Sequence, residues 1–150
     1  MIALVEIQDF LKKAGRGEID SSRFDDLIEQ FGEDCKDSLR KQLSSRGGYR
    51  IRMSGLGRPL CQQKMEQQGH TQEVAYNDIM RFLMGDLVEA IAVFVMKAAG
   101  VKVVDTQTPC ELQLGEKKIK GTLDLIMDDG EKKVWDIKST SPWFFVFFFF

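Results

Sequence analysis

The chain has little of what marks the specialised classes of protein. Its 150 residues include three prolines, three cysteines and one histidine, and 43% of them are hydrophobic. This composition excludes a collagen-like chain, a disordered chain and a disulfide-stapled scaffold. Because no apolar run reaches about 18 residues, no membrane-spanning helix is expected. The length suits one domain with one hydrophobic core.

The start of the chain lacks the basic residues and the long apolar stretch of a secretion signal. The three cysteines, Cys35, Cys61 and Cys110, are far apart in the sequence. Without a secretion signal, reduced thiols in a cytoplasm are the simplest interpretation. His70 lies in a loop sequence with no second metal ligand beside it, so a solvated position is predicted for this side chain.

The formal net charge of −2 hides an asymmetry along the chain. Residues 1–35 carry a net −5, residues 36–68 a net +6 and residues 69–150 a net −3. A basic segment in an acidic protein is either a solvated helix face or a phosphate-binding surface. The charge alone leaves both interpretations open.

The position of the arginines favours phosphate binding. Arg50, Arg52 and Arg58 flank a stretch with glycines and a serine, RIRMSGLGRPLC. Such a turn offers backbone N–H groups and a hydroxyl to a phosphate, and arginine is a forked donor. The segment lacks the Lys-Ser/Thr ending of a Walker A loop, so nucleotide hydrolysis is not indicated.

Helices are predicted before strands. A short helix is expected within the first 20 residues, and apolar spacing predicts a longer one over residues 22–45, capped by Ser21 or Ser22 and ended by Gly47-Gly48. Cys35 lies on the apolar stripe of that helix, which indicates a packed thiol. A short helix near residues 58–68 and a long one, from an Asn77 cap to about Ala99, follow.

The long helix carries a carboxylate in an otherwise apolar run, DLVEAIAVFVMKAAG. A buried Glu89 is costly unless it is paired or holds a metal. Gly85 lies one turn earlier on the same face and leaves open space beside Glu89. Glycine in a helix lowers its stability by about 1 kcal/mol relative to alanine. This combination suggests a site. The alternative is that Glu89 and Asp86 lie on a narrow exposed stripe, and the local sequence does not decide between the two.

The remaining sequence predicts strands. Short strands are expected over residues 101–104 and 111–114, with turn residues between them. Two β-rich runs, residues 118–127 and 132–140, flank Asp-Asp-Gly-Glu, which is a hairpin signal. Helices followed by hairpin strands predict a mixed α/β domain.

This hairpin carries charged residues where strands rarely hold them. Asp124 lies among apolar neighbours in the first strand, and Asp136 and Lys138 share a face of the second because they are two residues apart. Facing carboxylates repel each other unless a cation lies between them. Two carboxylates, with water and a substrate phosphate, are a usual setting for Mg²⁺.

The length of the hairpin loop decides whether the two carboxylates face each other. A loop of two or four residues would pair Asp124 with Trp135 and point the carboxylates to opposite faces. An odd loop, such as residues 129–131, pairs Asp124 with Asp136 on one face. We therefore predict a three- or five-residue loop, or a bulge, with Gly130 at positive φ.

Three motifs in this order carry a resemblance to a known family. Gly-x-x-x-Glu on a helix (residues 85–89), then Gly-x-x-Asp (121–124) and Asp-x-Lys (136–138) on a hairpin, resemble the PD-(D/E)xK nuclease superfamily. The glycine-containing form is most similar to its exonuclease branch, which includes lambda-type, RecB-type and cyanophage exonucleases. The resemblance covers about residues 22–143. It implies a restriction-endonuclease-like α/β core, in which a helix is followed by a small mixed sheet.

The resemblance also implies roles for individual residues. Asp124 and Asp136 would be the central ligands of Mg²⁺ or Mn²⁺, and the backbone C=O of Ile137 would complete the shell. Glu89 would bind the metal directly or through water. Lys138 would orient or deprotonate the attacking water and offset the phosphate charge. Metal-assisted phosphodiester hydrolysis suits such a set, because a cation lowers the pKa of bound water.

The implied activity is hydrolysis of DNA, by an exonuclease acting on DNA ends in phage recombination or DNA degradation, in the host cytoplasm. Arg52, Ser54 and Arg58 match the family's phosphate-binding segment and would hold duplex ends or single strands through the DNA backbone. An endonuclease or junction resolvase on the same core, and a non-catalytic DNA-binding module, are the alternatives. Ring-shaped trimers among relatives leave a homo-oligomer open, and no membrane partner is expected.

The end of the chain departs from the family pattern. The helix and strand that follow in relatives are absent, so C-terminal elements are expected to be missing, and residues 144–150 form an unmatched aromatic tail. Cys61 lies where relatives with an iron–sulfur cluster hold their first ligand, but three cysteines cannot supply a four-cysteine cluster. The expected organisation is an extension over residues 1–20, a nuclease domain over 21–143 and this tail.

Overall fold

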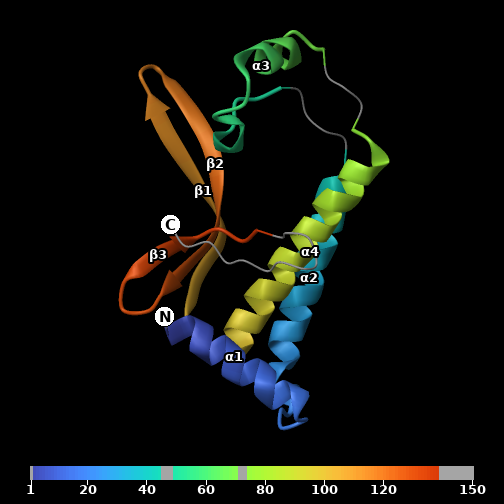
Figure 1. The fold of residues 1–150 in the computed structure, drawn as a ribbon, viewed down its shortest axis with the longest axis vertical. Coiled ribbons are helices and arrows are strands. Elements are labelled where there is room, and N and C mark those ends of the chain that lie inside the picture. The colour runs from blue at the N-terminus through green and yellow to red at the C-terminus, as the bar shows by residue number, and fades with distance from the viewer. Residues whose placement is uncertain (1, 45–48, 71–73, 139–150) are drawn as a thin grey trace.

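A computed structural model describes residues 2–44, 49–70 and 74–138 (Figure 1). These residues form four α-helices, two short 3₁₀ helices and one antiparallel sheet of order β1-β2-β3. The helices are α1 (Ile2–Gly15), η1 (Ser21–Phe24), α2 (Asp25–Leu43), η2 (Met53–Gly55), α3 (Leu60–Gln67) and α4 (Tyr76–Ala98). The strands are β1 (Val103–Leu114), β2 (Lys117–Asp128) and β3 (Lys132–Trp135). The mixed α/β class is confirmed.

The sheet is less mixed than expected. All strand pairs among the described residues are antiparallel, and parallel pairing occurs there as one isolated bridge between Arg52 and Lys120. Three predicted features lie outside the described residues: the Gly47-Gly48 helix end, the last residues of the strand predicted to reach 140, and the tail 144–150.

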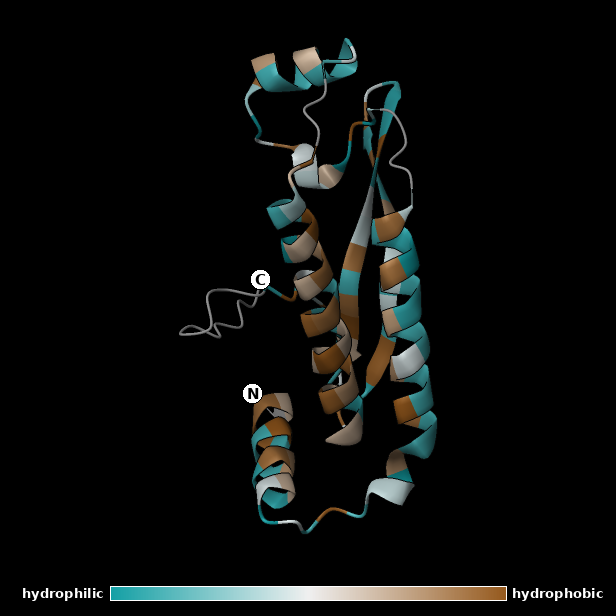
Figure 2. Cartoon of the chain, turned by 90° about the vertical axis from the view of Figure 1, so that its right-hand side faces the viewer, coloured by the Kyte–Doolittle hydropathy of each residue, from teal (hydrophilic) through white to brown (hydrophobic). Residues whose placement is uncertain are grey.

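The helices form a frame beside the sheet. Helices α2 and α4 lie side by side along their length, and α1 lies across their lower ends (Figure 1). The carboxyl-terminal half of α4 is the most hydrophobic part of this frame (Figure 2). The core joins α1, α4 and the sheet, and its buried residues are Ala3, Val93, Met96, Val101, Leu125 and Met127. Segment 1–20, expected to be an extension, therefore contributes a residue to the core.

Both predicted helix caps are wrong. Asp20 caps the start of η1, because its carboxylate accepts hydrogen bonds from Ser22 N at 3.1 Å and Ser22 Oγ at 2.8 Å. Asn77 lies inside the first turn of α4, and Ala75 is the residue that precedes the helix. The Ala75 carbonyl already accepts from the backbone N–H groups of Asp78 and Ile79, so the helix begins two residues earlier than an Asn77 cap predicts.

The two short strands predicted over residues 101–104 and 111–114 are one long strand, β1. Pro109 belongs to the segment predicted to hold turn residues, yet it lies within β1 opposite Thr122. Within the described residues β1 pairs with a neighbour on one side. Alternate N–H groups of such an edge strand point away from the sheet, so a proline without an N–H is tolerated there.

The hairpin of β2 and β3 has the predicted register. Asp128 pairs with Lys132 and Leu125 with Trp135, which leaves residues 129–131 as a three-residue loop. Gly130 in that loop has a φ of 105°, so both predictions are confirmed. However, β3 ends at Trp135. Asp136 and Lys138 therefore follow the strand and do not lie in its middle.

Candidate functional site

Asp124 and Asp136 come together at the end of the β2–β3 hairpin. Continuing the register past the Leu125–Trp135 pair places Asp136 opposite Asp124. The backbone beyond β3 stays attached to β2 there, because Ile137 N donates a hydrogen bond of 3.0 Å to Asp124 Oδ2. Ile137 also packs against the core, which holds this segment in place.

The two carboxylates of this pair repel each other, and the charge of Lys138 offsets part of that repulsion. Burial raises the pKa of Asp124 above its ordinary value, the hydrogen bond from Ile137 N opposes that rise, and the Asp136 carboxyl group raises the pKa further. A carboxylate whose pKa is raised by burial and by a second carboxylate beside it attracts a proton or a cation. The arrangement is thus electrostatically suited to a cation.

Lys138 supplies a positive charge beside the pair. Its Nζ lies 2.7 Å from Asp136 Oδ1, and the two side chains are 62% and 45% exposed. The hydrogen bond with Asp136 raises the pKa of Lys138, and the charges of Asp136, Asp124 and Glu89 raise it further. A protonated lysine that remains accessible to solvent can contact an incoming anionic substrate.

Glu89 approaches from helix α4 and is half-buried, as is Asp86, so the exposed-stripe alternative is wrong. Burial raises the pKa of Glu89, a hydrogen bond from Gln107 opposes this, and the charges of Asp124 and Asp86 raise it further. Asp86 itself accepts a 2.9 Å hydrogen bond from Gln42 Nε2. Glu89 is therefore within electrostatic reach of both Asp124 and Lys138.

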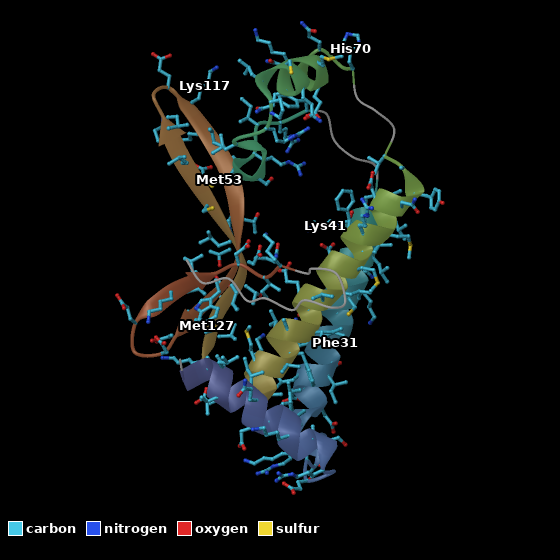
Figure 3. All side chains as sticks on the ribbon, in the orientation of Figure 1. Phe31, Lys41, Met53, His70, Lys117 and Met127 are labelled. Atoms are coloured by element: carbon cyan, nitrogen blue, oxygen red, sulfur yellow. The ribbon has the colours of Figure 1, made fainter. Side chains whose placement is uncertain are left out.

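A cleft of about 290 Å³ opens beside Glu89, between α2, α4 and β1. Four of its ten lining residues are acidic, and Lys41 of α2 contributes a cation (Figure 3). The lining residues are Asp34, Asp37, Ser38, Lys41, Asp86, Glu89, Ala90, Val93, Thr106 and Gln107. Such a surface favours cations over anions.

The donor set fits Mg²⁺ or Mn²⁺ through two carboxylates. In the described part of the chain, no three His, Cys, Asp or Glu side chains gather closely enough to hold a metal ion. Mg²⁺ is commonly bound by one or two carboxylates together with water and substrate phosphate. Asp124 and Asp136 meet that requirement, and Glu89 stands further off, bonded to Gln107.

The predicted phosphate-binding residues form a separate group. Arg52 precedes η2 and bridges to Lys120, which is four residues before Asp124 in β2, or about 13 Å along the strand. Ser54 is exposed within η2. The guanidinium of Arg58 donates with both terminal nitrogens to the Glu66 carboxylate of α3, with Nη1 3.2 Å from Oε2. These residues flank the carboxylates and do not join them.

Sequence reasoning missed two glutamines that organise these groups. Gln63 Nε2 donates to the carbonyls of Gly55 at 3.2 Å and Arg58 at 2.9 Å, which fixes the loop after η2. Gln107 donates to Glu89 Oε1. An isolated glutamine in a polar stretch gives no periodic or motif signal, so neither contact could be read from the sequence.

The predictions for the thiols and the histidine are confirmed where the structure tests them. Cys35 is half-buried, and burial raises the pKa of its thiol. The three cysteines are free thiols. His70 is exposed in the segment that follows α3 (Figure 3).

Comparisons of this chain with models of known protein families, with curated proteins and with solved structures found no match. Among the helices in the part of the chain that the structure describes, none has the length and hydrophobicity needed to span a bilayer.

Proposed function

We propose that the chain is a Mg²⁺- or Mn²⁺-dependent deoxyribonuclease, an exonuclease that hydrolyses phosphodiester bonds from DNA ends. The observation that carries this proposal is the register that sets Asp124 opposite Asp136, with Lys138 paired to Asp136. Two carboxylates and a lysine in this order are what the PD-(D/E)xK resemblance requires. The raised pKa of Asp124 supports it, because the neighbouring Asp136 carboxyl group contributes to that rise and a bound cation would relieve the repulsion.

In this proposal each residue has a distinct task. Asp124 and Asp136 would hold the cation, with the Ile137 carbonyl beside them, and Glu89 would be reached directly or through water. When bound, the cation would lower the pKa of a water and stabilise negative charge on the phosphate. The raised pKa of Lys138 keeps its amine protonated, which favours orienting the water and offsetting phosphate charge over accepting a proton.

DNA would bind along the side of the hairpin that carries η2. Arg52, Ser54 and Arg58 would contact the DNA backbone at a distance from the carboxylates, so that binding is independent of sequence and sensitive to salt. A separation of about 13 Å between Lys120 and Asp124 corresponds to about four nucleotide steps along the axis of a DNA duplex, because each step rises about 3.4 Å. The arginines would therefore hold nucleotides that flank the scissile bond.

A second candidate function is a DNA-binding module without catalysis. It is favoured by the finding that three metal-ligating side chains do not gather among the described residues. In that case the arginine segment would bind DNA, and the carboxylate pair would bind a cation without cleavage. Homo-oligomerisation and a host-cytoplasmic location remain predictions of the resemblance.

The decisive experiment compares linear and covalently closed circular DNA, each with Mg²⁺, Mn²⁺ or a chelator. We expect metal-dependent loss of linear DNA alone, and no loss with Asp124→Ala. Asp129→Ala is the matched control, because Asp129 is a carboxylate in the loop of the same hairpin and pairs with Lys133 at 3.2 Å. Cleavage of closed circles would favour an endonuclease, whereas DNA binding without cleavage would favour the second candidate.

A further inference from the structure

Gln107 has an unusual backbone conformation. Its φ is 52°, and it is the one residue other than glycine with a positive φ in the described part of the chain. Side chains other than glycine rarely adopt this left-handed region, and glutamine has no special tolerance for it. Such a conformation persists when the surrounding structure imposes it, and it often marks a functional site.

The local structure holds Gln107 in this conformation. The Asp105 carboxylate accepts a 2.9 Å hydrogen bond from Thr106 N and another of 2.9 Å from Thr108 Oγ1. One carboxylate therefore binds both neighbours of Gln107. Thr106 and Thr108 pair with Leu125 and Leu123 of β2. Those two leucines are the neighbours of Asp124, so Gln107 lies opposite Asp124 across the β1–β2 ladder.

The amide of Gln107 contacts a carboxylate of helix α4. Gln107 Nε2 donates to Glu89 Oε1, joining β1 to α4 at the edge of the acidic cleft. This contact opposes the rise in the pKa of Glu89 that burial causes. The neutral amide donates a hydrogen bond to one carboxylate oxygen and leaves the negative charge of Glu89 in place. A lysine in the same position would neutralise that charge. Among the described residues, the hydrogen bond to Glu89 is made at Oε1, which leaves its second oxygen to contact a water or a cation.

We propose that Gln107 is a positioning residue that aims the Glu89 carboxylate at the cation held by Asp124 and Asp136. The inference rests on the proposed nuclease function. It assigns a task to a residue that no sequence motif marks, and it explains why a strained conformation is kept. A partner that orients a metal-binding side chain commonly contributes about 10- to 100-fold in metal affinity.

Gln107→Gly separates positioning from structural support. Glycine adopts positive φ without strain, so the variant should be at least as stable as the wild type in thermal unfolding without metal. Without the amide, its affinity for Mn²⁺ in the absence of DNA should fall about tenfold, as measured by titration calorimetry. Cleavage should require correspondingly more Mg²⁺, with the maximal rate largely recovered at saturating metal.

Two further variants control this test. Gln107→Asn keeps an amide and tolerates the left-handed conformation, but it is one methylene shorter and should bind Mn²⁺ as weakly as Gln107→Gly. If the glycine variant does not fold, the asparagine variant decides. Gln113→Ala removes another amide of β1, which donates to the Gly115 carbonyl at the tip of the β1–β2 hairpin. This variant should bind Mn²⁺ as the wild type does.

The outcomes separate this inference from the proposed function. Wild-type Mn²⁺ affinity in Gln107→Gly would overturn the positioning role and leave the nuclease proposal standing. A Gln107→Gly variant that loses stability as well as affinity would also overturn it, because the amide would then act as a structural support. A wild-type chain that binds no Mn²⁺ would overturn both.

Discussion

Met53 lies so close to Gly121 that a β-carbon added to this glycine would stand 2.7 Å from Met53 Sδ and 3.1 Å from Met53 Cβ. The contact attaches η2 to the sheet, beside the Arg52–Lys120 bridge (Figure 3). The Cys110 thiol lies 3.7 Å from the same sulfur. Gly121 is the glycine of the Gly-x-x-Asp motif. Because it has no side chain, the segment that carries the candidate phosphate-binding residues can pack closely against it.

Gly121→Ala should therefore loosen this attachment. Contacts with Met53 Cβ cannot be relieved by rotating the side chain, so the backbone of η2 must shift, and we expect a loss of about 1–3 kcal/mol in the free energy of unfolding. DNA affinity should fall as well, because Arg52 moves with η2. Denaturant titration and filter binding measure the two effects. Gly55→Ala, with open space around it among the described residues, is the control, and unchanged stability in Gly121→Ala would refute the packing argument.

Two glycines in helix interiors allow a test of the open space beside Glu89. Among the described residues, Gly85 in α4 and Gly32 in α2 have no atom within 4 Å of an added β-carbon. Alanine at either position should stabilise the chain by about 1 kcal/mol, because it is the better helix former. If substrate uses the space beside Glu89, Gly85→Ala should slow DNA cleavage while Gly32→Ala should not. Equal activity of both variants would make Gly85 a plain helix residue.

The hairpin shows why part of this site could be predicted from the sequence. Side-chain alternation and loop length are local properties, so the spacing of Asp124, Gly130 and Asp136 is enough to predict register. Pro109 shows the opposite case. Its place in β1 depends on the strand lying at the edge of the described sheet, which is a tertiary fact.

Contacts between residues far apart in the chain could not be predicted from the sequence, because they too depend on tertiary structure. Whether Glu89 is half-buried depends on how α2 and β1 lie against α4, and no periodicity within α4 determines that. The Arg58–Glu66 pair and the Gln107–Glu89 contact join residues 8 and 18 positions apart through turns of irregular geometry. Arg58, which the sequence predicts to bind phosphate, thus has a carboxylate partner in the structure.

The raised pKa of Asp124 predicts a pH dependence of stability without metal. Because the folded state holds this proton more tightly than the unfolded state, the free energy of unfolding should fall as pH rises from the ordinary value of 3.8 through the folded pKa. Asp124→Asn should flatten this dependence and raise stability at neutral pH by less than about 1 kcal/mol, since solvent screens a half-open site.

Thermal unfolding with and without Mg²⁺ checks this expectation. The wild type should gain stability on adding Mg²⁺ and Asp124→Asn should not, because binding to the folded state alone shifts the equilibrium. Asp128→Asn is the contrasting control. The hydrogen bond from Lys102 lowers the pKa of Asp128, so its stabilising contribution is present at neutral pH and is lost as pH falls. A stability difference between the wild type and Asp124→Asn that stays the same as pH rises through this range would contradict the assignment for Asp124.

The Arg58–Glu66 ion pair predicts a gain of DNA binding. Arg58 cannot hold a phosphate with its full fork while both terminal nitrogens donate to Glu66. Glu66→Gln should free the guanidinium and tighten DNA binding by about two- to fivefold, the range expected for a surface pair. Arg58→Ala should weaken binding and lower the slope of affinity against salt by about one counterion.

A matched charge change separates this local effect from general electrostatics. Glu116→Gln at the tip of the β1–β2 hairpin alters the net charge equally, away from Arg58, and should change DNA affinity less than Glu66→Gln. The double variant Arg58→Ala with Glu66→Gln should bind no better than Arg58→Ala, because the carboxylate acts through that arginine. If Glu66→Gln tightened binding equally in both backgrounds, Glu66 would repel DNA directly and Arg58 would be a structural partner.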